Sequence, residues 1–321
     1  MPEADAPAYD TPPDVRPLSG LTEPPTPEPW MAAALAQLPD SRTVAVQGCP
    51  IEVLTWGDAG KPGLLFVHGG VAHAHWWDHV APLFTATHSC AALSLSGMGN
   101  SGWREDYAHD LYAEEVVAAA DAAGLFDGGA KPMLVGHSFG GLVSVHALTL
   151  HGERFAGGVI VDPPIIPLER RLLQERRRDR SHVNYDDPAR LVSRFRLIPD
   201  EPATQPALLH HVARTGVVER EGGWQWAFDP NVWGKTDPER GHPDFRAVAD
   251  RIAVIRAEDS KVVGADSAAT LRGWLTPETP FVEVPGAGHH VMLNQPLAFV
   301  AALRAILQCW PPALPPAGAR D

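Results

Sequence analysis

Four short runs of the chain are apolar at every position, without the polar alternation of a half-exposed strand. They span residues 64–67, 133–135, 159–161 and 252–255. A strand that is apolar on both sides has to be covered on both faces, which is the situation of a parallel sheet between two layers of helices. The runs therefore predict a parallel sheet in the interior of the molecule, and they limit the chain to folds that enclose such a sheet.

Helix-like stretches alternate with strand-like runs along the chain. The helix-like stretches cover residues 112–123, 141–150, 265–275 and 297–307, and further strand-like runs occur at 43–46, 51–56, 90–95 and 281–284. Such alternation indicates right-handed crossovers in which a helix joins two parallel strands. The expected fold class is α/β, with a doubly wound, mostly parallel sheet.

The two ends of the chain differ in composition from the middle. Nine of the 32 prolines lie in the first thirty residues, and four more lie in the last eleven. Segments of this kind bury too little apolar surface to offset the entropy of ordering them. We therefore expect a proline-rich N-terminal arm over residues 1–40, anchored by a short helix from Trp30, and a C-terminal tail over residues 311–321.

Residues 163–245 interrupt the alternation of strands and helices, because they contain no strong strand signal. We expect this segment to form a mainly helical cap over one end of the sheet. The core would then be built from residues 41–162 and 246–310, which gives one α/β domain with an insertion.

Two features of the expected cap have more than one interpretation. The tryptophans Trp224, Trp226 and Trp233 either form a small core of the cap or shape an apolar pocket near the nucleophile. The arginine-rich stretch at 170–180 is either a solvated helix face or turns one arginine inward, where it would select a substrate with a carboxylate.

The charge balance restricts the partners of the chain. It has 26 basic and 39 acidic residues, and a net charge of -13 repels nucleic-acid phosphates and anionic lipid headgroups. The three cysteines, Cys49, Cys90 and Cys309, are an odd number without metal-type spacing. The sequence shows no secretory signal and no run of about eighteen apolar residues. We expect a cytoplasmic protein that acts on a small molecule, without nucleic acid or membrane as a partner.

The sharpest motif lies at residues 136–140, which read Gly-His-Ser-Phe-Gly between an apolar strand and a helix of small residues. A serine projected from a tight strand-to-helix turn needs a positive φ and small neighbours two positions away on each side. Gly136 and Gly140 supply that room, and the N-terminus of the following helix directs free N–H groups at developing negative charge. Ser138 is therefore the candidate nucleophile.

A second glycine turn, His-Gly-Gly at 68–70, follows the apolar run 64–67. A turn in this place can aim a backbone N–H group at the same site. We expect the N–H groups of Gly70 and Phe139 to form an oxyanion hole with two donors. The alternative is an ordinary glycine turn after a buried strand.

The candidate general base is His289, which follows a glycine turn after the strand-like run 281–284. Histidine has an unperturbed pKa of about 6.5, so it can accept the serine proton near neutral pH and return it to a leaving group. The neighbouring His290 is the alternative base, and we otherwise expect it to pack or hydrogen-bond nearby.

These motifs resemble those of the α/β-hydrolase family over residues 43–310. The matching pieces are the turn at 68–70, the Ser-Gly-Met-Gly-Asn-Ser turn at 96–101, the elbow at Ser138, and Gly-Ala-Gly-His at 286–289. The family order of nucleophile, acid and histidine also fits. The resemblance implies a serine hydrolase with an α/β-hydrolase fold, and it implies no cofactor and no metal.

The acid of the triad is where this chain departs from most of that family. Most members carry it in a Gly-x-x-Asp turn after the strand that follows the cap, but residues 257–260 read Ala-Glu-Asp-Ser. A minority carry it at the end of the strand before the cap and pair it with a serine in the later turn. We choose Asp162, which has this earlier place and would orient the imidazole. Asp259 and Glu258 stay open as alternatives, since an aspartate before proline also fits a plain strand end.

Three further histidines, His73, His75 and His79, follow the first glycine turn. Their spacing is compatible with metal ligands, but Asp78 is the one carboxylate nearby and no cysteine completes a ligand set. We interpret them as structural or pocket-lining residues and expect no metal. His137, inside the elbow, is interpreted as a packing residue.

The predicted function is a serine hydrolase that cleaves an ester, thioester, lactone, amide or carbon–carbon bond of a small molecule, with a carboxylic ester as first choice. His289 takes the proton of Ser138, two backbone N–H groups hold the oxyanion, and water releases the acyl group. Serine at the elbow argues against haloalkane dehalogenase and epoxide hydrolase chemistry, for which the resemblance implies an aspartate. Two alternatives are a binding protein without turnover and a cofactor-free oxygenase or lyase on the same fold.

Overall fold

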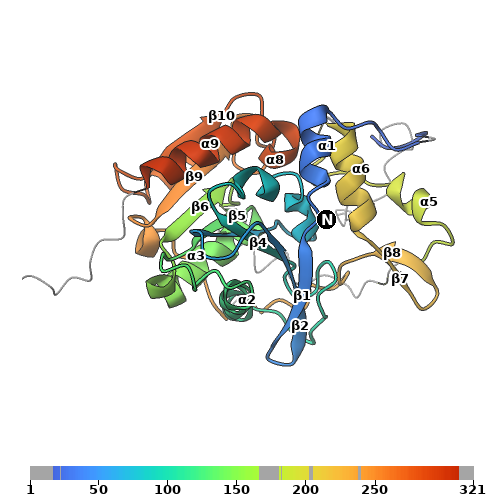
Figure 1. Cartoon of the computed structure of the whole chain (residues 1–321), viewed down its shortest axis with the longest axis horizontal. Helices are drawn as coiled ribbons and strands as arrows, with labels where there is room; N and C mark the ends of the chain where they lie inside the picture. The colour runs from blue at the N-terminus through green and yellow to red at the C-terminus, as the bar shows by residue number, and fades with distance from the viewer. Residues whose placement is uncertain are drawn as a thin grey trace, which may run out of the picture.

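The structure, a computed structural model, describes residues 17–21, 23–165, 181, 183–201, 205–237 and 240–310 of the chain. It contains an eight-stranded sheet with the order β1-β2-β4-β3-β5-β6-β9-β10 (Figure 1). The pairs β1–β2 and β2–β4 are antiparallel, and every other neighbouring pair is parallel. The predicted α/β class with a doubly wound, mostly parallel sheet is confirmed. The strands are β1 (Asp40–Val46), β2 (Cys49–Trp56), β3 (Gly63–Val67), β4 (Ser89–Leu93), β5 (Met133–His137), β6 (Gly157–Val161), β9 (Ile252–Ala257) and β10 (Phe281–Val284).

The apolar run of β3 shows why the sheet lies in the interior. Leu64 and Phe66 belong to one apolar cluster, whereas Leu65 and Val67 belong to another. Successive side chains of a strand point to opposite faces of the sheet, so a run without polar residues buries both faces. All four side chains are 0% exposed.

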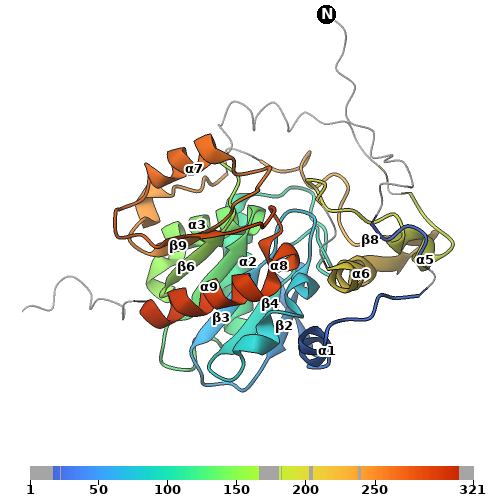
Figure 2. The same cartoon turned by 90° about the horizontal axis from the view of Figure 1, so that it is seen from above.

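Two layers of helices cover the two faces of the sheet (Figures 1 and 2). In Figure 1, α8 and α9 lie above the strands, and α2 and α3 lie below them. In α9, the buried residues Phe299, Leu303 and Ile306 recur at helical spacing and form the face that packs on the sheet. One layer consists of α2 (His109–Ala122), α3 (Phe139–His151) and α7 (Ala265–Arg272), and the other of α1 (Pro29–Leu35), α8 (Val291–Asn294) and α9 (Pro296–Cys309).

No helix in the described part of the chain is long and apolar enough to cross a bilayer.

Helix α1 is the short helix that the sequence predicts around Trp30. Met31 and Ala34 are each 1% exposed, whereas Trp30 is only half-buried and donates its indole N–H to Glu28. The described part of the N-terminal segment is therefore anchored by Met31 together with Leu18, which is also 1% exposed and packs in the same apolar cluster. The rest of the expected arm, at residues 1–16 and 22, and the expected tail at 311–321 lie outside the described residues.

We call the chain between β6 and β9 the β6–β9 connection. Its described α-helices and its hairpin lie to one side of the sheet, at the right of Figure 1. Its described residues include a two-stranded hairpin that the sequence did not predict. The hairpin strands have four residues each, too few for a clear periodic signal, and Gly222 and Gly223 adopt φ of 92° and 122° at the turn. The expected arginine-rich stretch at 170–180 lies outside the described residues. The elements are α5 (Pro188–Val192), α6 (Pro206–Thr215), β7 (Val217–Arg220) and β8 (Gly223–Trp226).

Three strands end at the same edge of the sheet and lead into the candidate site. Ser138 follows β5, Asp162 follows β6, and the turn that leads to His289 follows β10. Because β5, β6, β9 and β10 pair in parallel, their carboxyl ends meet at one edge, where open α/β sheets bind their ligands.

Candidate active site

Ser138 lies in a strained turn between β5 and α3. Its φ is 53° and its ψ is -120°, a conformation that non-glycine residues rarely adopt. A Cβ atom on Gly136 would collide with the carbonyl of Gly140, and one on Gly140 would collide with the carbonyl of His68. The two glycines are therefore needed for the turn, which leaves the side chain of Ser138 partly exposed.

His289 connects Ser138 to Asp162 through its two ring nitrogens. Nε2 lies 2.9 Å from Oγ of Ser138, and Nδ1 lies 2.7 Å from Oδ2 of Asp162. Both His289 and Asp162 are buried, at 3% and 0% exposure. The carboxylate can only accept at Nδ1, so Nδ1 carries the hydrogen and Nε2 is free to accept the serine proton.

Asp162 is held firmly in its place at the end of β6. Its φ is 45°, its Oδ1 accepts the N–H of Ala257 at 3.0 Å, and its Oδ2 accepts the hydroxyl of Ser260 at 2.5 Å. The two other candidate acids, Asp259 and Glu258, are exposed, and Glu258 accepts a backbone N–H from the turn before His289. The structure thus brings Asp162, and neither alternative, into contact with His289.

The glycine turn after β3 lies against the elbow. A Cβ atom built on Gly70 would be 3.7 Å from Cβ of Phe139. Neither N–H of these two residues donates to an acceptor within the described part of the chain. Two unpaired N–H groups beside Ser138, one of them at the N-terminus of α3, are suited to bind a developing oxyanion.

His68 fixes the conformation of this turn. Its Nδ1 lies 2.7 Å from the carbonyl of Gly69, and its Nε2 accepts the N–H of Leu95 at 3.0 Å. Complete burial lowers the pKa of His68 to about 4, so the ring is neutral at physiological pH. A neutral ring can donate at Nδ1 and accept at Nε2, as these two contacts require.

Trp233 is the one of the three tryptophans that lies at the candidate site. Its ring is 5.0 Å from the ring of Phe139, and a Cβ atom on Gly70 would be 2.7 Å from its Cζ2. Trp226 instead packs on Phe195 at 5.6 Å. Trp233 therefore lies beside the elbow, whereas Trp226 packs within the β6–β9 connection.

His137, next to Ser138, is a buried packing residue as interpreted from the sequence. Its Nε2 donates to the backbone carbonyl of His289 at 3.0 Å, and the two rings are 4.8 Å apart. Burial and the neighbouring histidines hold the pKa of His137 well below its ordinary value, so it stays neutral. It supports the backbone of His289 without contacting the Ser138 hydroxyl.

The histidines after the glycine turn have separate protein partners. His73 contacts the carbonyl of Val212 at 3.1 Å, and His79 contacts the carbonyl of Met292 at 2.9 Å. His75 instead pairs with Asp78 at 2.9 Å. Among the described residues, no group of three His, Cys, Asp or Glu side chains is arranged to hold a metal ion.

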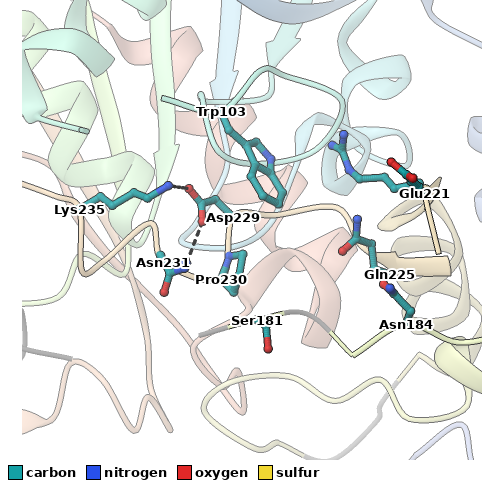
Figure 3. A pocket seen from close by; sticks show the side chains of 10 residues that line it. Trp103, Ser181, Asn184, Glu221, Gln225, Asp229, Pro230, Asn231 and Lys235 are labelled. Atoms are coloured by element: carbon teal, nitrogen blue, oxygen red, sulfur yellow. Dashed lines mark hydrogen bonds and ion pairs between the residues drawn. The ribbon is translucent and has the colours of Figure 1, made fainter. Parts of the chain in front are cut away.

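A separate polar pocket of about 370 Å³ lies between Trp103 and the β6–β9 connection (Figure 3). None of its lining residues belongs to the group around Ser138. Asp229, which is 1% exposed, accepts from Lys235 at 2.8 Å and from the hydroxyl of Tyr107 at 2.9 Å. Because this buried carboxylate is already paired, we assign no ligand to the pocket.

Glu201, which was not predicted from the sequence, has a carboxylate that accepts hydrogen bonds from the segment that carries His289. Glu201 is 8% exposed and lies between α5 and α6. It belongs to no recognisable motif, and 88 residues separate it from His289. Only the packing of the β6–β9 connection against the core brings the two together.

A family model and several known proteins match this chain. Residues 64–303 match the Alpha/beta hydrolase family. Esterase Rv0045c of Mycobacterium tuberculosis is 27% identical over 274 residues, which cover 82% of this chain and 88% of that protein. 2-(Acetamidomethylene)succinate hydrolase of Mesorhizobium japonicum is 27% identical over 243 residues, which cover 72% of this chain and 82% of that protein. A crystal structure of E-2-(acetamidomethylene)succinate hydrolase matches with a TM-score of 0.70 and 23% identity, over 84% of this chain and 100% of that chain.

Proposed function

Because this chain belongs to the alpha/beta hydrolase family and is a hydrolase, we propose that it is a serine hydrolase that cleaves an ester-like bond of a small molecule through an acyl-enzyme. The single observation that carries the proposal is the hydrogen-bonded chain from Ser138 through His289 to Asp162. This is the arrangement that a serine nucleophile needs in order to lose its proton as it attacks.

In the first half of the reaction, Nε2 of His289 takes the hydroxyl proton while Oγ of Ser138 bonds to the substrate carbonyl carbon. The carbonyl oxygen becomes an oxyanion, which receives hydrogen bonds from the N–H groups of Gly70 and Phe139. Asp162 stabilises the imidazolium that forms. When the oxyanion collapses, the leaving group takes the proton from His289 and departs, which leaves the acyl group on the serine.

In the second half, His289 takes a proton from water, and the resulting hydroxide oxygen attacks the acyl carbon. The same two N–H groups hold the second oxyanion. Its collapse breaks the bond to Oγ, and the proton returns from His289 to Ser138. The products are a carboxylic acid and the free enzyme, so no redox step and no cofactor is needed for this chemistry.

We also propose that residues 163–245 act as a cap that borders the acyl site, on a core formed by residues 41–162 and 246–310. The position of Trp233 supports this, since its ring lies against Phe139 and over Gly70. An indole in that place supplies an apolar wall next to the carbonyl under attack. We expect carboxylic esters to be turned over best, in line with the esterase among the relatives.

A fluorophosphonate probe and a series of p-nitrophenyl esters test the proposal together. We expect the wild-type chain to gain one covalent probe and to release p-nitrophenol from esters, with a rate that depends on acyl chain length. Ser138→Ala should lose both properties while its melting temperature stays close to that of the wild type. A wild-type chain that takes up no probe and hydrolyses no ester would instead favour the binding protein or the lyase.

A further inference from the structure

Glu201 binds the backbone of the segment that carries the candidate base. One of its carboxylate oxygens, Oε1, accepts the N–H of His289 at 2.5 Å. The other, Oε2, accepts the N–H of His290 at 3.3 Å and lies 2.9 Å from Nδ1 of the same residue. Three N–H donors therefore converge on one buried carboxylate, which comes from the β6–β9 connection rather than from the core.

Gly288 lies directly against the carboxylate of Glu201. A Cβ atom on Gly288 would lie 2.6 Å from the carboxyl carbon of Glu201 and within 2.9 Å of both its oxygens. Gly288 does not have a positive φ, so its backbone conformation is open to any residue. The need for glycine at this position therefore arises from the close approach of Glu201.

The charges of Glu201 and His290 depend on their burial and on the hydrogen bonds between them. Burial by itself would raise the pKa of Glu201, but the hydrogen bonds and charge of His290 and the N–H of His289 bring it below its ordinary value. Burial lowers the pKa of His290, although the hydrogen bond to Glu201 opposes this. Near neutral pH the carboxylate is therefore ionised and the His290 ring is neutral, with a hydrogen on Nδ1.

His289 needs this support because it lies in a turn between β10 and α8, where no regular ladder of hydrogen bonds fixes the backbone. The core holds its ring through Asp162 and its carbonyl through His137. The N–H is the remaining backbone group, and Glu201 is its partner. Displacement of a reacting group by about 1 Å can reduce the rate by a factor of about 100.

We infer that Glu201 is a positioning residue that holds the backbone of residues 288–290, so that Nε2 of His289 stays in line with Oγ of Ser138. Through it, the β6–β9 connection contributes to the alignment of the catalytic base. This inference rests on the proposed serine hydrolase function, because it assigns Glu201 a part in proton transfer by His289.

The test compares Glu201→Gln, Glu201→Ala, Gly288→Ala and the double variant Glu201→Ala/Gly288→Ala with the wild type. For each, kcat and KM are measured on a p-nitrophenyl ester, and the rates are divided by the fraction of protein that a fluorophosphonate titrates. This division removes the effect of misfolded protein. Asp187→Ala is the matched control, since Asp187 is a carboxylate of the same connection that caps an exposed backbone N–H at the start of α5.

We expect Glu201→Ala to lower kcat per titrated site by a factor of about 10 to 100, with KM changed by less than about twofold. Glu201→Gln keeps one carbonyl acceptor, so it should fall between the wild type and Glu201→Ala. Gly288→Ala should reproduce the loss by pushing the carboxylate away, but it should have little further effect in the Glu201→Ala background. Asp187→Ala should keep the wild-type kcat.

Wild-type kcat per titrated site in Glu201→Ala, together with a lower melting temperature, would show a purely structural role and overturn the inference while the proposed function stands. If Glu201→Ala does not fold, Glu201→Gln and Gly288→Ala decide the matter, and wild-type kcat in both overturns it. Failure of the wild-type chain to take up the probe overturns the proposed function, and this inference with it.

Discussion

The hydroxyl of Ser260 donates a hydrogen bond of 2.5 Å to Oδ2 of Asp162, across a separation of 98 residues. The same oxygen contacts Nδ1 of His289 at 2.7 Å. Ser260 stands in the turn after β9, so in this chain that turn binds the carboxylate of Asp162. Oδ2 accepts two hydrogen bonds at once and Oδ1 accepts the N–H of Ala257, so the carboxylate is held at both of its oxygens.

The first prediction concerns the acid. Asp162→Asn should lower kcat on a p-nitrophenyl ester by a factor of about 1,000 or more, because an amide no longer fixes the productive tautomer or stabilises the imidazolium. Asp259→Asn is the matched control and should stay within about twofold of the wild type, since its side chain is exposed. A crippled Asp259→Asn beside an active Asp162→Asn would move the acid to the later turn.

The second prediction concerns Ser260. Its Oγ donates to Asp162 and also accepts the N–H groups of Val262 and Val263 at 3.1 and 2.8 Å. Ser260→Ala leaves these groups unpaired, so the free energy of unfolding should fall by about 1 to 3 kcal/mol. The rate should fall by about tenfold, far less than in Asp162→Asn, because the carboxylate stays. Urea unfolding and steady-state kinetics measure the two effects, and equal losses in the two variants would contradict this division of roles.

The third prediction concerns the space between Gly70 and Trp233. A Cβ atom on Gly70 would lie 2.7 Å from Cζ2 of the indole, so Gly70→Ala should displace the turn that carries a proposed oxyanion donor. We expect kcat to fall by a factor of about 100. Phenylalanine lacks the second ring of the indole, so Trp233→Phe in the Gly70→Ala background should restore much of the rate. A double variant no faster than Gly70→Ala would show that this clash is not the cause.

The fourth prediction concerns stability at acid pH. Burial lowers the pKa of His68 and His79 to about 4 and that of His73 to about 3. In the unfolded chain these histidines take up protons near pH 6.5, which the folded protein does not do until about pH 4 or below. The contribution of these buried, neutral histidines to the free energy of unfolding is therefore complete above pH 6.5 and is lost as the pH falls towards 4.

His79→Gln tests this relation at one of the three histidines. The amide can keep the donor to the carbonyl of Met292, which His79 contacts at 2.9 Å, but it does not titrate. The slope of unfolding free energy against pH between 6 and 4 should become shallower by about 1.4 kcal/mol per pH unit. Chemical unfolding at several pH values measures this slope, and an unchanged slope would show that His79 is protonated in the folded state.

Much of the fold followed from local signals. The unbroken apolar runs predicted β3, β5, β6 and β9, and the glycine pattern around Ser138 predicted a strand-to-helix turn, because both depend only on residues within a few positions. The short helix α8 and the hairpin of β7 and β8 were not predicted from the sequence. Elements of four residues carry too little periodicity to stand out, and they form because neighbouring elements pack on them.

By itself, the sequence determined the parallel α/β sheet, the place of Ser138 and the choice of His289 as its candidate partner. These depend on backbone requirements that short motifs express directly. Only the tertiary structure decided which carboxylate contacts His289, that Trp233 rather than Trp226 lies at the site, and that Glu201 holds the histidine segment. Such contacts join residues about a hundred positions apart, and their partners are selected by how the connection and the strand ends pack in space, which no local pattern records.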